Sequence, residues 1–424
     1  MGRTALAALC GVYVALAALW AEPGSDVVLA TAGGSPDWLL GPLRFAGQGF
    51  ADGPASGPLF YAGLWLALLL WGAVLLRAGE IRPGVAAGAI AGLHVLFLIA
   101  PPLLSQDAFS YIAYARLGVE HDLGPYTHAP VDIPADPVFG FAGSKDAESV
   151  YGPAFTLLTY PLAPLGVPTA FWLLKGIAAL SSLGVVALVW VAVRRLGRDP
   201  VLPAMFVGLN PHVVVHVVGG AHNEALVMLV VMAGVVLFLA GREPAGAFAA
   251  TAAASLKASA GLVVPFLVLG ARRVVPAVAG AALAGALIAG VALAAFGADA
   301  LDALGVLSSN QDRTSRWSFP YKTAELLGVL LPGERVDYRD AVRAAYGVAF
   351  AAVALTLMWR TWQRRIDPVT AAAWATAAIL VSSAWLVPWY ALWLLPLAAL
   401  VPDRRLWLTS AALSAWMLAI AVPL

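Results

Sequence analysis

The sequence is short of charged residues and of cysteine, and each shortage excludes a class of protein. Only 12% of the 424 residues are charged, whereas soluble globular domains carry about 25%. The single cysteine, Cys10, excludes an internal disulfide and a thiolate metal cluster. The basic residues are scattered over short links and form no stripe, so we expect no nucleic-acid partner.

Apolar residues make up 61% of the chain, and they recur in runs that are long enough to cross a membrane. The runs are continuous, whereas a transmembrane barrel would alternate apolar and polar residues. Because lipid tolerates only helices or closed barrels, the pattern predicts an all-α, polytopic transmembrane helix bundle. We expect about 11–13 membrane segments in a single domain over residues 1–424.

Eleven runs are predicted to be full membrane spans. They are Thr4–Ala21, Pro58–Arg77, Gly84–Leu103, Thr169–Val193, Val201–Val217, Ala225–Ala240, Val274–Phe296, Ala341–Trp359, Pro368–Ala384, Trp389–Val401 and Leu406–Val422.

Two further apolar segments are predicted not to cross the membrane. Ala245–Leu269 has basic residues on both flanks, so a hairpin of two half-length helices with Lys257 near its apex keeps both ends on one side. Gly152–Gly166 is short and rich in proline, and it is predicted to be re-entrant or interfacial.

The charges sort by the side of the membrane. With Arg3 and the Arg242–Glu243 pair, five short links hold 14 of the 25 Lys/Arg and only 5 of the 24 Asp/Glu. These links are Arg77–Arg82, Arg194–Asp199, Arg272–Arg273, Arg360–Asp367 and Asp403–Arg405. By the positive-inside rule the basic links are cytoplasmic, and the acidic segments Asp26–Asp52, Asp107–Glu148 and Asp299–Asp340 face outward. The Ala, Gly, Val and Arg bias is typical of a GC-rich bacterial genome, so with its many spans we expect a multi-pass protein of a bacterial plasma membrane.

Two long outer loops, 105–151 and 297–340, are predicted to form the active face. The first opens with Asp107–Glu120, whose spacing predicts a helix lying along the membrane surface. The residues expected on one side of that helix are Phe109, Ile112, Ala113, Arg116 and Leu117.

Asp107 stands where a membrane span meets this interfacial helix, and two roles are open to it. A carboxylate held at the membrane surface can act as a general base. Aspartate is also a favoured N-cap residue, so the alternative is that Asp107 caps the helix and has no catalytic role.

A second polar cluster contains His212, His216, His222, Asn223 and Glu224. His212 and His216 are four residues apart and share a helix face, but the spacing is a poor match to a metal site, so no metal ligands are assigned. Ionisable groups at membrane depth are costly and usually functional, so His222, Asn223 and Glu224 are predicted to bind substrate. The alternative is that they cap the following helix.

The basic residues of the outer face are candidates for binding phosphate. Lys257 lies in an apolar hairpin and needs an anionic substrate, an acidic partner or a path to water. Arg313, Arg316 and Lys322 accompany Trp317, and arginine forks suit phosphate while tryptophan suits a sugar ring. The alternative is a solvated loop against lipid headgroups. Tyr151 and Trp389 also face outward, where aromatic residues can form an interfacial belt.

The order and spacing of these motifs resemble GT-C type membrane glycosyltransferases, in particular actinobacterial polyprenol-phosphomannose-dependent α-1,6-mannosyltransferases. The motifs that carry the resemblance are Ser105-Gln106-Asp107…Ser110-Tyr111, Gly124-Pro125-Tyr126, Tyr151-Gly152-Pro153, Asn210-Pro211, Gly219-Gly220-Ala221-His222-Asn223-Glu224 and Leu256-Lys257. The resemblance covers roughly Leu103 to Tyr390. It departs from the family at Glu224, which is often aspartate there.

The resemblance implies an inverting transfer of a sugar, with mannose favoured, from a polyprenyl-phosphate donor to a mannan, lipoglycan or glycolipid. Asp107 would be the base, Arg313, Arg316, Lys322 and Lys257 would bind the phosphate, and Tyr111, Tyr126 and Tyr151 would join the substrate-binding residues. A divalent cation at the leaving phosphate stays open. Two rival functions also stay open: transfer of arabinofuranose or glucose, and transport of a lipid-linked sugar.

Overall fold

The computed structural model describes residues 1–22, 25, 27–28, 35–47, 49–50, 56–310 and 313–420. Parts of the sequence predictions lie outside these ranges. They are Asp26 and Asp52 of the first acidic segment, Gln311 and Asp312 of the second outer loop, and Val422 at the end of the last predicted span.

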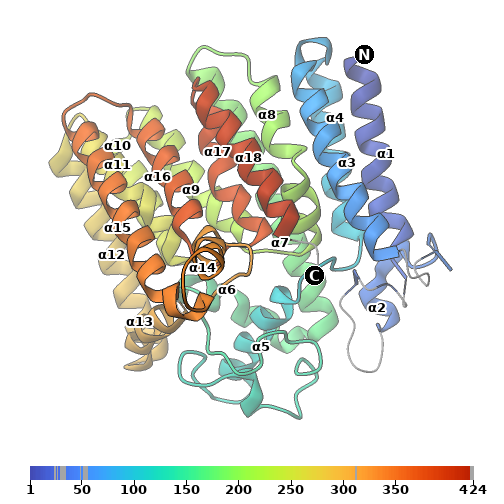
Figure 1. The fold of residues 1–424 in the computed structure, drawn as a ribbon. Coiled ribbons are helices and arrows are strands. Elements are labelled where there is room, and N and C mark those ends of the chain that lie inside the picture. The colour runs from blue at the N-terminus through green and yellow to red at the C-terminus, as the bar shows by residue number, and fades with distance from the viewer. Residues whose placement is uncertain are drawn as a thin grey trace.

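The chain folds into a bundle of helices that run roughly parallel to one another, with shorter helices gathered at one end (Figure 1). The α-helices are α1 (Gly2–Leu19), α2 (Asp37–Leu40), α3 (Ser56–Leu76), α4 (Pro83–Ile99), α5 (Asp107–Glu120), α6 (Pro153–Thr159), α7 (Val167–Arg195), α8 (Val201–Gly208), α9 (Glu224–Leu239), α10 (Glu243–Ala254), α11 (Val264–Gly270), α12 (Val274–Phe296), α13 (Asp299–Asn310), α14 (Phe319–Leu330), α15 (Arg335–Trp362), α16 (Pro368–Ser382), α17 (Ala391–Leu400) and α18 (Arg404–Ile420).

Short helical turns connect many of these elements. They are η1 (Gly41–Leu43), η2 (Ala78–Glu80), η3 (Pro130–Asp132), η4 (Tyr160–Leu165), the π-helix η5 (His212–Gly219), η6 (Ala258–Val263) and η7 (Pro388–Tyr390). The described residues form no β-strand, only an isolated bridge between Val28 and Leu103.

Five of the described helices, α1, α3, α7, α12 and α15, are long and apolar enough to cross a membrane, and joining α8 to η5 makes a sixth candidate. Shorter apolar helices, among them α4, α9 and α16, pack between them. The prediction of an all-α, polytopic membrane protein is confirmed.

The predicted span Val201–Val217 is wrong as a single helix. It is broken at Asn210–Pro211, and η5 continues at 50° to α8. Proline has no N–H for the helix ladder and clashes with the preceding turn, which accounts for the break. η5 is buried throughout. The segment from Gly220 to Glu224 follows its last residue, Gly219.

The two segments that were predicted not to cross the membrane consist of short helices. Residues 245–269 form the hairpin: α10 packs against η6 and α11, and Lys257 lies in the turn between α10 and η6. Residues 152–166 form α6 and η4, which are too short to span a membrane and pack against α5.

The helix α5 has the predicted bounds, and its course along the membrane stays a prediction. The structure shows that α5 is more deeply buried than its amphipathic spacing indicates. Nearly all of its residues from Ala108 to Leu117 are buried. Phe109 stacks on Phe141 and Phe171, with ring centroids 5.1 Å away in each case. Phe141 belongs to the segment that follows α5, and Phe171 belongs to α7, so two later parts of the chain cover this side of α5.

The second outer loop is also more ordered than expected, because most of residues 297–340 are helical. α13 and α14 are amphipathic helices, and α15 begins at Arg335, before the predicted start of its span.

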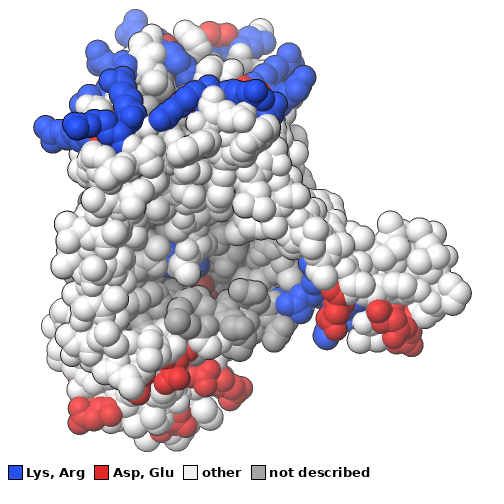
Figure 2. Space-filling model, turned by 90° about the vertical axis from the view of Figure 1, so that its left-hand side faces the viewer, with Lys and Arg blue, Asp and Glu red and all other residues white. Residues whose placement is uncertain are grey.

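Charge separates along the bundle as the sequence predicts. Lys and Arg gather at one end and acidic residues toward the other, and a hollow opens between them on the face that Figure 2 shows. The arrangement places the basic links together, opposite the end that carries α5, α6 and α14 (Figure 1).

Candidate functional site

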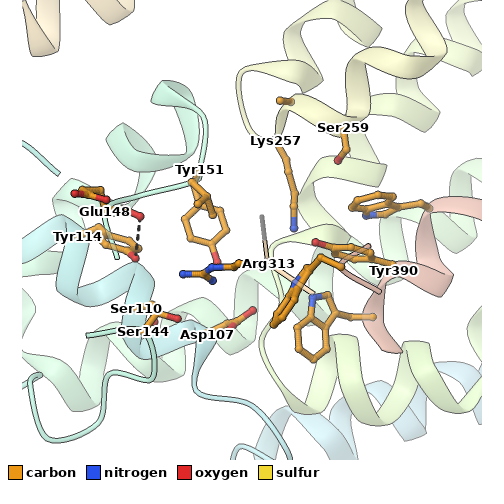
Figure 3. A pocket seen from close by; sticks show the side chains of 15 residues that line it. Asp107, Ser110, Tyr114, Ser144, Glu148, Tyr151, Lys257, Ser259, Arg313 and Tyr390 are labelled. Carbon is orange, nitrogen blue, oxygen red and sulfur yellow. Dashed lines mark hydrogen bonds between the residues drawn. The ribbon is translucent and has the colours of Figure 1, made fainter. Parts of the chain in front are cut away.

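A pocket of about 460 Å³ lies between α5, the loop before α6, the turn after α10 and the link between α16 and α17. It combines carboxylates, cations, hydroxyls and a wall of aromatic rings (Figure 3). Its lining residues are Asp107, Ser110, Tyr114, Ser144, Glu148, Val150, Tyr151, Lys257, Ala258, Ser259, Arg313, Trp385, Trp389, Tyr390 and Trp393. Segments that are far apart in the sequence therefore meet in one cavity, whose composition suits a sugar bearing an anionic group.

The carboxylate of Asp107 faces this pocket and does not cap its helix. The N-cap of α5 is Gln106, and Asp107 is the first residue inside the helix, with its backbone N–H 3.2 Å from Ser105 Oγ. Oδ2 of Asp107 lies 3.3 Å from Nδ1 of His222, and the side chain is 35% exposed. The geometry contradicts the cap-only interpretation and leaves the carboxylate accessible to a ligand.

Burial by itself would raise the pKa of the Asp107 carboxyl. The neighbouring imidazole of His222 and the positive charges of Lys257 and Arg313 outweigh this effect and hold the pKa below its ordinary value. The carboxylate is therefore ionised at neutral pH and able to accept a proton.

His222 contacts Asp107 from within the protein and does not line the pocket. It is fully buried, and its ring stacks on Trp389 with centroids 3.8 Å apart. Its Nδ1 also lies 3.9 Å from Glu224, the first residue of α9. The stacked indole and the two carboxylates fix the position of the imidazole.

Glu224 and Lys257 form a buried ion pair behind the pocket. Nζ of Lys257 donates to Oε1 of Glu224, and the Glu224 side chain is fully buried while that of Lys257 is 15% exposed. The rings of Tyr390, Trp393 and Tyr151 surround the ammonium at 4.9, 5.6 and 5.9 Å. Despite its burial, the charge of Glu224 raises the pKa of Lys257 above its ordinary value.

Tyr111 and Tyr151 support the pocket from the side of α5. The Tyr111 hydroxyl accepts a hydrogen bond of 3.3 Å from the backbone N–H of Asn223, and its ring packs edge-on against Tyr151. Only Tyr151 of the two lines the pocket. Tyr111 and Asn223 join α5 to the segment that carries His222 and Glu224.

Gly152 ties the first outer loop to the turn that carries Lys257. Its N–H donates to Leu256 O at 3.1 Å, and the N–H of Ala154 donates to Ser255 O at 3.1 Å. A Cβ on Gly152 would lie 2.0 Å from Ser255 O, so only glycine fits this close approach.

The aromatic wall was only partly predicted. Trp385, Trp389 and Tyr390 come from the link between α16 and α17, and Trp393 from the first turn of α17. Trp393 carried no sequence signal, because a tryptophan in an apolar run is typical of a membrane span. Arg313 lies at the wall, with its guanidinium 5.9 Å from the centre of the Trp385 ring.

Eight predicted site residues lie outside the pocket lining. Four have been described above: Tyr111, His222, Asn223 and Glu224. The other four are Tyr126, Arg316, Trp317 and Lys322. Tyr126 is buried, and its hydroxyl is bonded to Tyr151 O and Thr156 at 3.1 Å each. Lys322 pairs with Glu325 at 2.7 Å and covers the ring of Trp317 at 4.3 Å. Trp317 also packs against Trp416, and Arg316 is exposed on the same segment.

The described residues contain no group of three His, Cys, Asp or Glu side chains placed to hold a metal ion. His212 and His216 stack on each other inside η5, with centroids 5.3 Å apart, and His212 Nε2 is bonded to Ser414 O at 2.7 Å. These two histidines therefore help to pack the bundle.

Comparison with protein families gives two matches. The family model described as "Alpha-(1->6)-mannopyranosyltransferase, N-terminal domain" matches residues 6–273. The model described as "MptB C-terminal domain" matches residues 323–424.

Curated relatives point the same way. Alpha-(1->6)-mannopyranosyltransferase A of Mycobacterium tuberculosis is 29% identical over 94% of this chain and 83% of its own length. The enzyme of the same name from Corynebacterium glutamicum is 26% identical over 53% of this chain and 49% of its own length. No solved structure matches the chain significantly.

The buried ion pair yields a prediction about stability. Lys257→Met leaves the Glu224 carboxylate buried without its partner, which we expect to cost about 3–5 kcal/mol. The double variant Lys257→Met/Glu224→Gln removes both charges and should recover most of the loss. Thermal unfolding in detergent measures the stability of the single and the double variant against the wild type.

Lys322→Met is the matched control, because the Lys322–Glu325 pair is exposed and exposed pairs contribute about 0–1 kcal/mol. Equal losses in Lys257→Met and Lys322→Met would show that Lys257 does not stabilise the fold through Glu224.

Proposed function

The chain belongs to the alpha-(1->6)-mannopyranosyltransferase family, and from this premise we propose that it transfers mannose from a polyprenyl-phosphate donor to a mannoside. The acceptor is the end of a mannan, lipoglycan or glycolipid, and the new bond is an α-1,6 linkage. The observation that supports the reaction most directly is the position of the Asp107 carboxylate, in an aromatic pocket that also contains Lys257 and Arg313.

The proposed reaction is a single inverting displacement. The 6-hydroxyl oxygen of the acceptor attacks the anomeric carbon of the donor as the bond from that carbon to the phosphate oxygen breaks. The hydroxyl proton passes to Asp107, and the electron pair leaves with polyprenyl phosphate. A β-linked donor then gives an α-linked product, and one carboxylate suffices because a phosphate leaving group needs no proton.

The negative charge that grows on the leaving phosphate needs stabilisation within the pocket. Arg313 is the best placed group, because its guanidinium lies at the pocket wall and suits bidentate binding of phosphate oxygens. Lys257 adds positive charge, but its ammonium is already paired with Glu224, so we assign it a lesser share. The rings of Trp385, Trp389 and Tyr390 offer surfaces for the sugars.

The donor is a membrane lipid, and the fold provides for one. The bundle is apolar, and Figure 2 shows a hollow in its side with charged atoms visible inside. We infer from the basic links at the opposite end that the pocket faces the extracytoplasmic side of a bacterial plasma membrane.

Asp107→Asn tests the base. The amide keeps the shape of the side chain but accepts no proton, so we expect kcat to fall by about 100-fold or more while donor binding persists. The assay is transfer from polyprenyl-phosphate-mannose to a short α-mannoside by the protein in lipid nanodiscs. Undiminished transfer by a folded Asp107→Asn variant would overturn the assignment.

Arg313 and Arg316 form a matched pair for testing the phosphate site, because only Arg313 lines the pocket. Arg313→Gln should weaken donor binding by about tenfold or more, as expected when a charged hydrogen bond is lost. Arg316→Gln should change the affinity much less. Donor titration of both variants gives the comparison, and the reverse ranking would move the phosphate to the Arg316 side.

Cysteine labelling tests which side the pocket faces. In a Cys10→Ala background, the exposed positions Asp146 and Gln363 are replaced singly by cysteine. A membrane-impermeant maleimide should label Asp146→Cys in intact cells and Gln363→Cys only after the membrane is opened. The opposite pattern would place the pocket in the cytoplasm.

A further inference from the structure

Lys175 lies in the third turn of α7, and neither the pocket nor the reaction above uses it. Its side chain is completely buried. Nζ lies within hydrogen-bonding distance of three backbone carbonyl oxygens, those of Ala100 at 2.5 Å, Pro101 at 3.4 Å and Gly219 at 3.1 Å. An ammonium has three donors and no acceptor, so this cage of carbonyls matches its needs.

The three carbonyls belong to the ends of two helices. Ala100 is the C-cap of α4, and Pro101 follows it. Gly219 is the last residue of η5. The C-terminal end of a helix carries partial negative charge, so one ammonium stabilises both ends and holds them together.

Each of these ends leads within a few residues to one half of the site. The chain runs from Pro101 to Asp107 on one side, and from Gly219 to His222 and Glu224 on the other. The two halves then meet through the 3.3 Å contact between Asp107 and His222.

Both connecting segments contain strained backbone. Leu104 has φ 62° and Ala221 has φ 55°, which are left-handed values that residues other than glycine rarely adopt. Such conformations persist only where the surroundings hold them firmly, and they gather at functional sites. Lys175 provides a fixed point immediately before each of the two strained residues.

We propose that Lys175 is a positioning residue, whose ammonium joins the ends of α4 and η5 and thereby sets the distance between Asp107 and His222. The inference rests on the proposed function only in making Asp107 the base. Lys175 itself touches no substrate, and its effect passes through the two backbone segments.

The side chains that lower the pKa of Asp107 come from three other segments. They are His222 before α9, Lys257 in the α10–η6 turn, and Arg313 before α14. Loss of Lys175 should displace His222 and leave Lys257 and Arg313 in place. The pKa of Asp107 then rises, and the acidic limb of the pH–rate profile moves to higher pH.

The test compares Lys175→Met and Lys175→Gln with Ser182→Ala. Ser182 is two turns further along α7, and its Oγ makes an equally buried link of 2.9 Å to His94 Nε2 of α4. Ser182→Ala therefore removes a polar contact between the same two helices away from the site. Lys175→Gln keeps two hydrogen-bond donors at this position. It is the variant to measure if Lys175→Met does not fold.

We expect Lys175→Met to lower kcat by about 100-fold, the effect of a displacement of about 1 Å in an active site. The Michaelis constant for the donor should stay unchanged, and the acidic limb should move to higher pH. The kcat of Lys175→Gln should lie between those of Lys175→Met and the wild type. Ser182→Ala should keep the wild-type pH profile. A folded Lys175→Met variant with wild-type kcat, or with lower kcat and an unmoved acidic limb, would overturn the proposal.

Hydrogen–deuterium exchange in nanodiscs supplies a readout that needs no activity. Residues 104–109 and 220–225 should exchange faster in the Lys175 variants and not in Ser182→Ala. Absence of transfer by the wild-type protein would count against the proposed function, whereas unchanged exchange in both segments would count against the role of Lys175.

Discussion

The bundle contains lysines and carboxylates at depths where water is scarce, and the site depends on how these charges are satisfied. An uncompensated charge in an apolar interior is costly, so each must find a partner in the protein. Lys257 finds the carboxylate of Glu224, and Lys175 finds the carbonyls at two helix ends. Both solutions join segments that are distant in the sequence, so the same contacts that satisfy the charges also assemble the pocket.

Several features of this arrangement were readable from the sequence, because they depend on composition and local spacing. The sorting of basic links predicted which helix ends lie together, and the basic flanks of residues 245–269 predicted a hairpin with Lys257 at its turn. Asp107 was predicted at the start of a helix facing the site, and the structure places its carboxylate in the pocket.

The remaining features depend on tertiary contacts that spacing does not encode. Burial of α5 follows from Phe141 and Phe171, which approach Phe109 from later in the chain. Arg313 and Arg316 are indistinguishable as sequence signals, yet only the first lines the pocket. Lys175 lay within a predicted span, where its carbonyl partners were invisible without the fold.

The backbone tie at Gly152 has a mechanical consequence. Two hydrogen bonds and a contact that excludes any side chain fasten the loop of Tyr151 to the turn of Lys257. A movement of one segment would strain these two hydrogen bonds unless the other segment moved with it. A ligand that moves Tyr151 would therefore also move the turn that carries Lys257. The positions of these two residues in the pocket are coupled through the backbone.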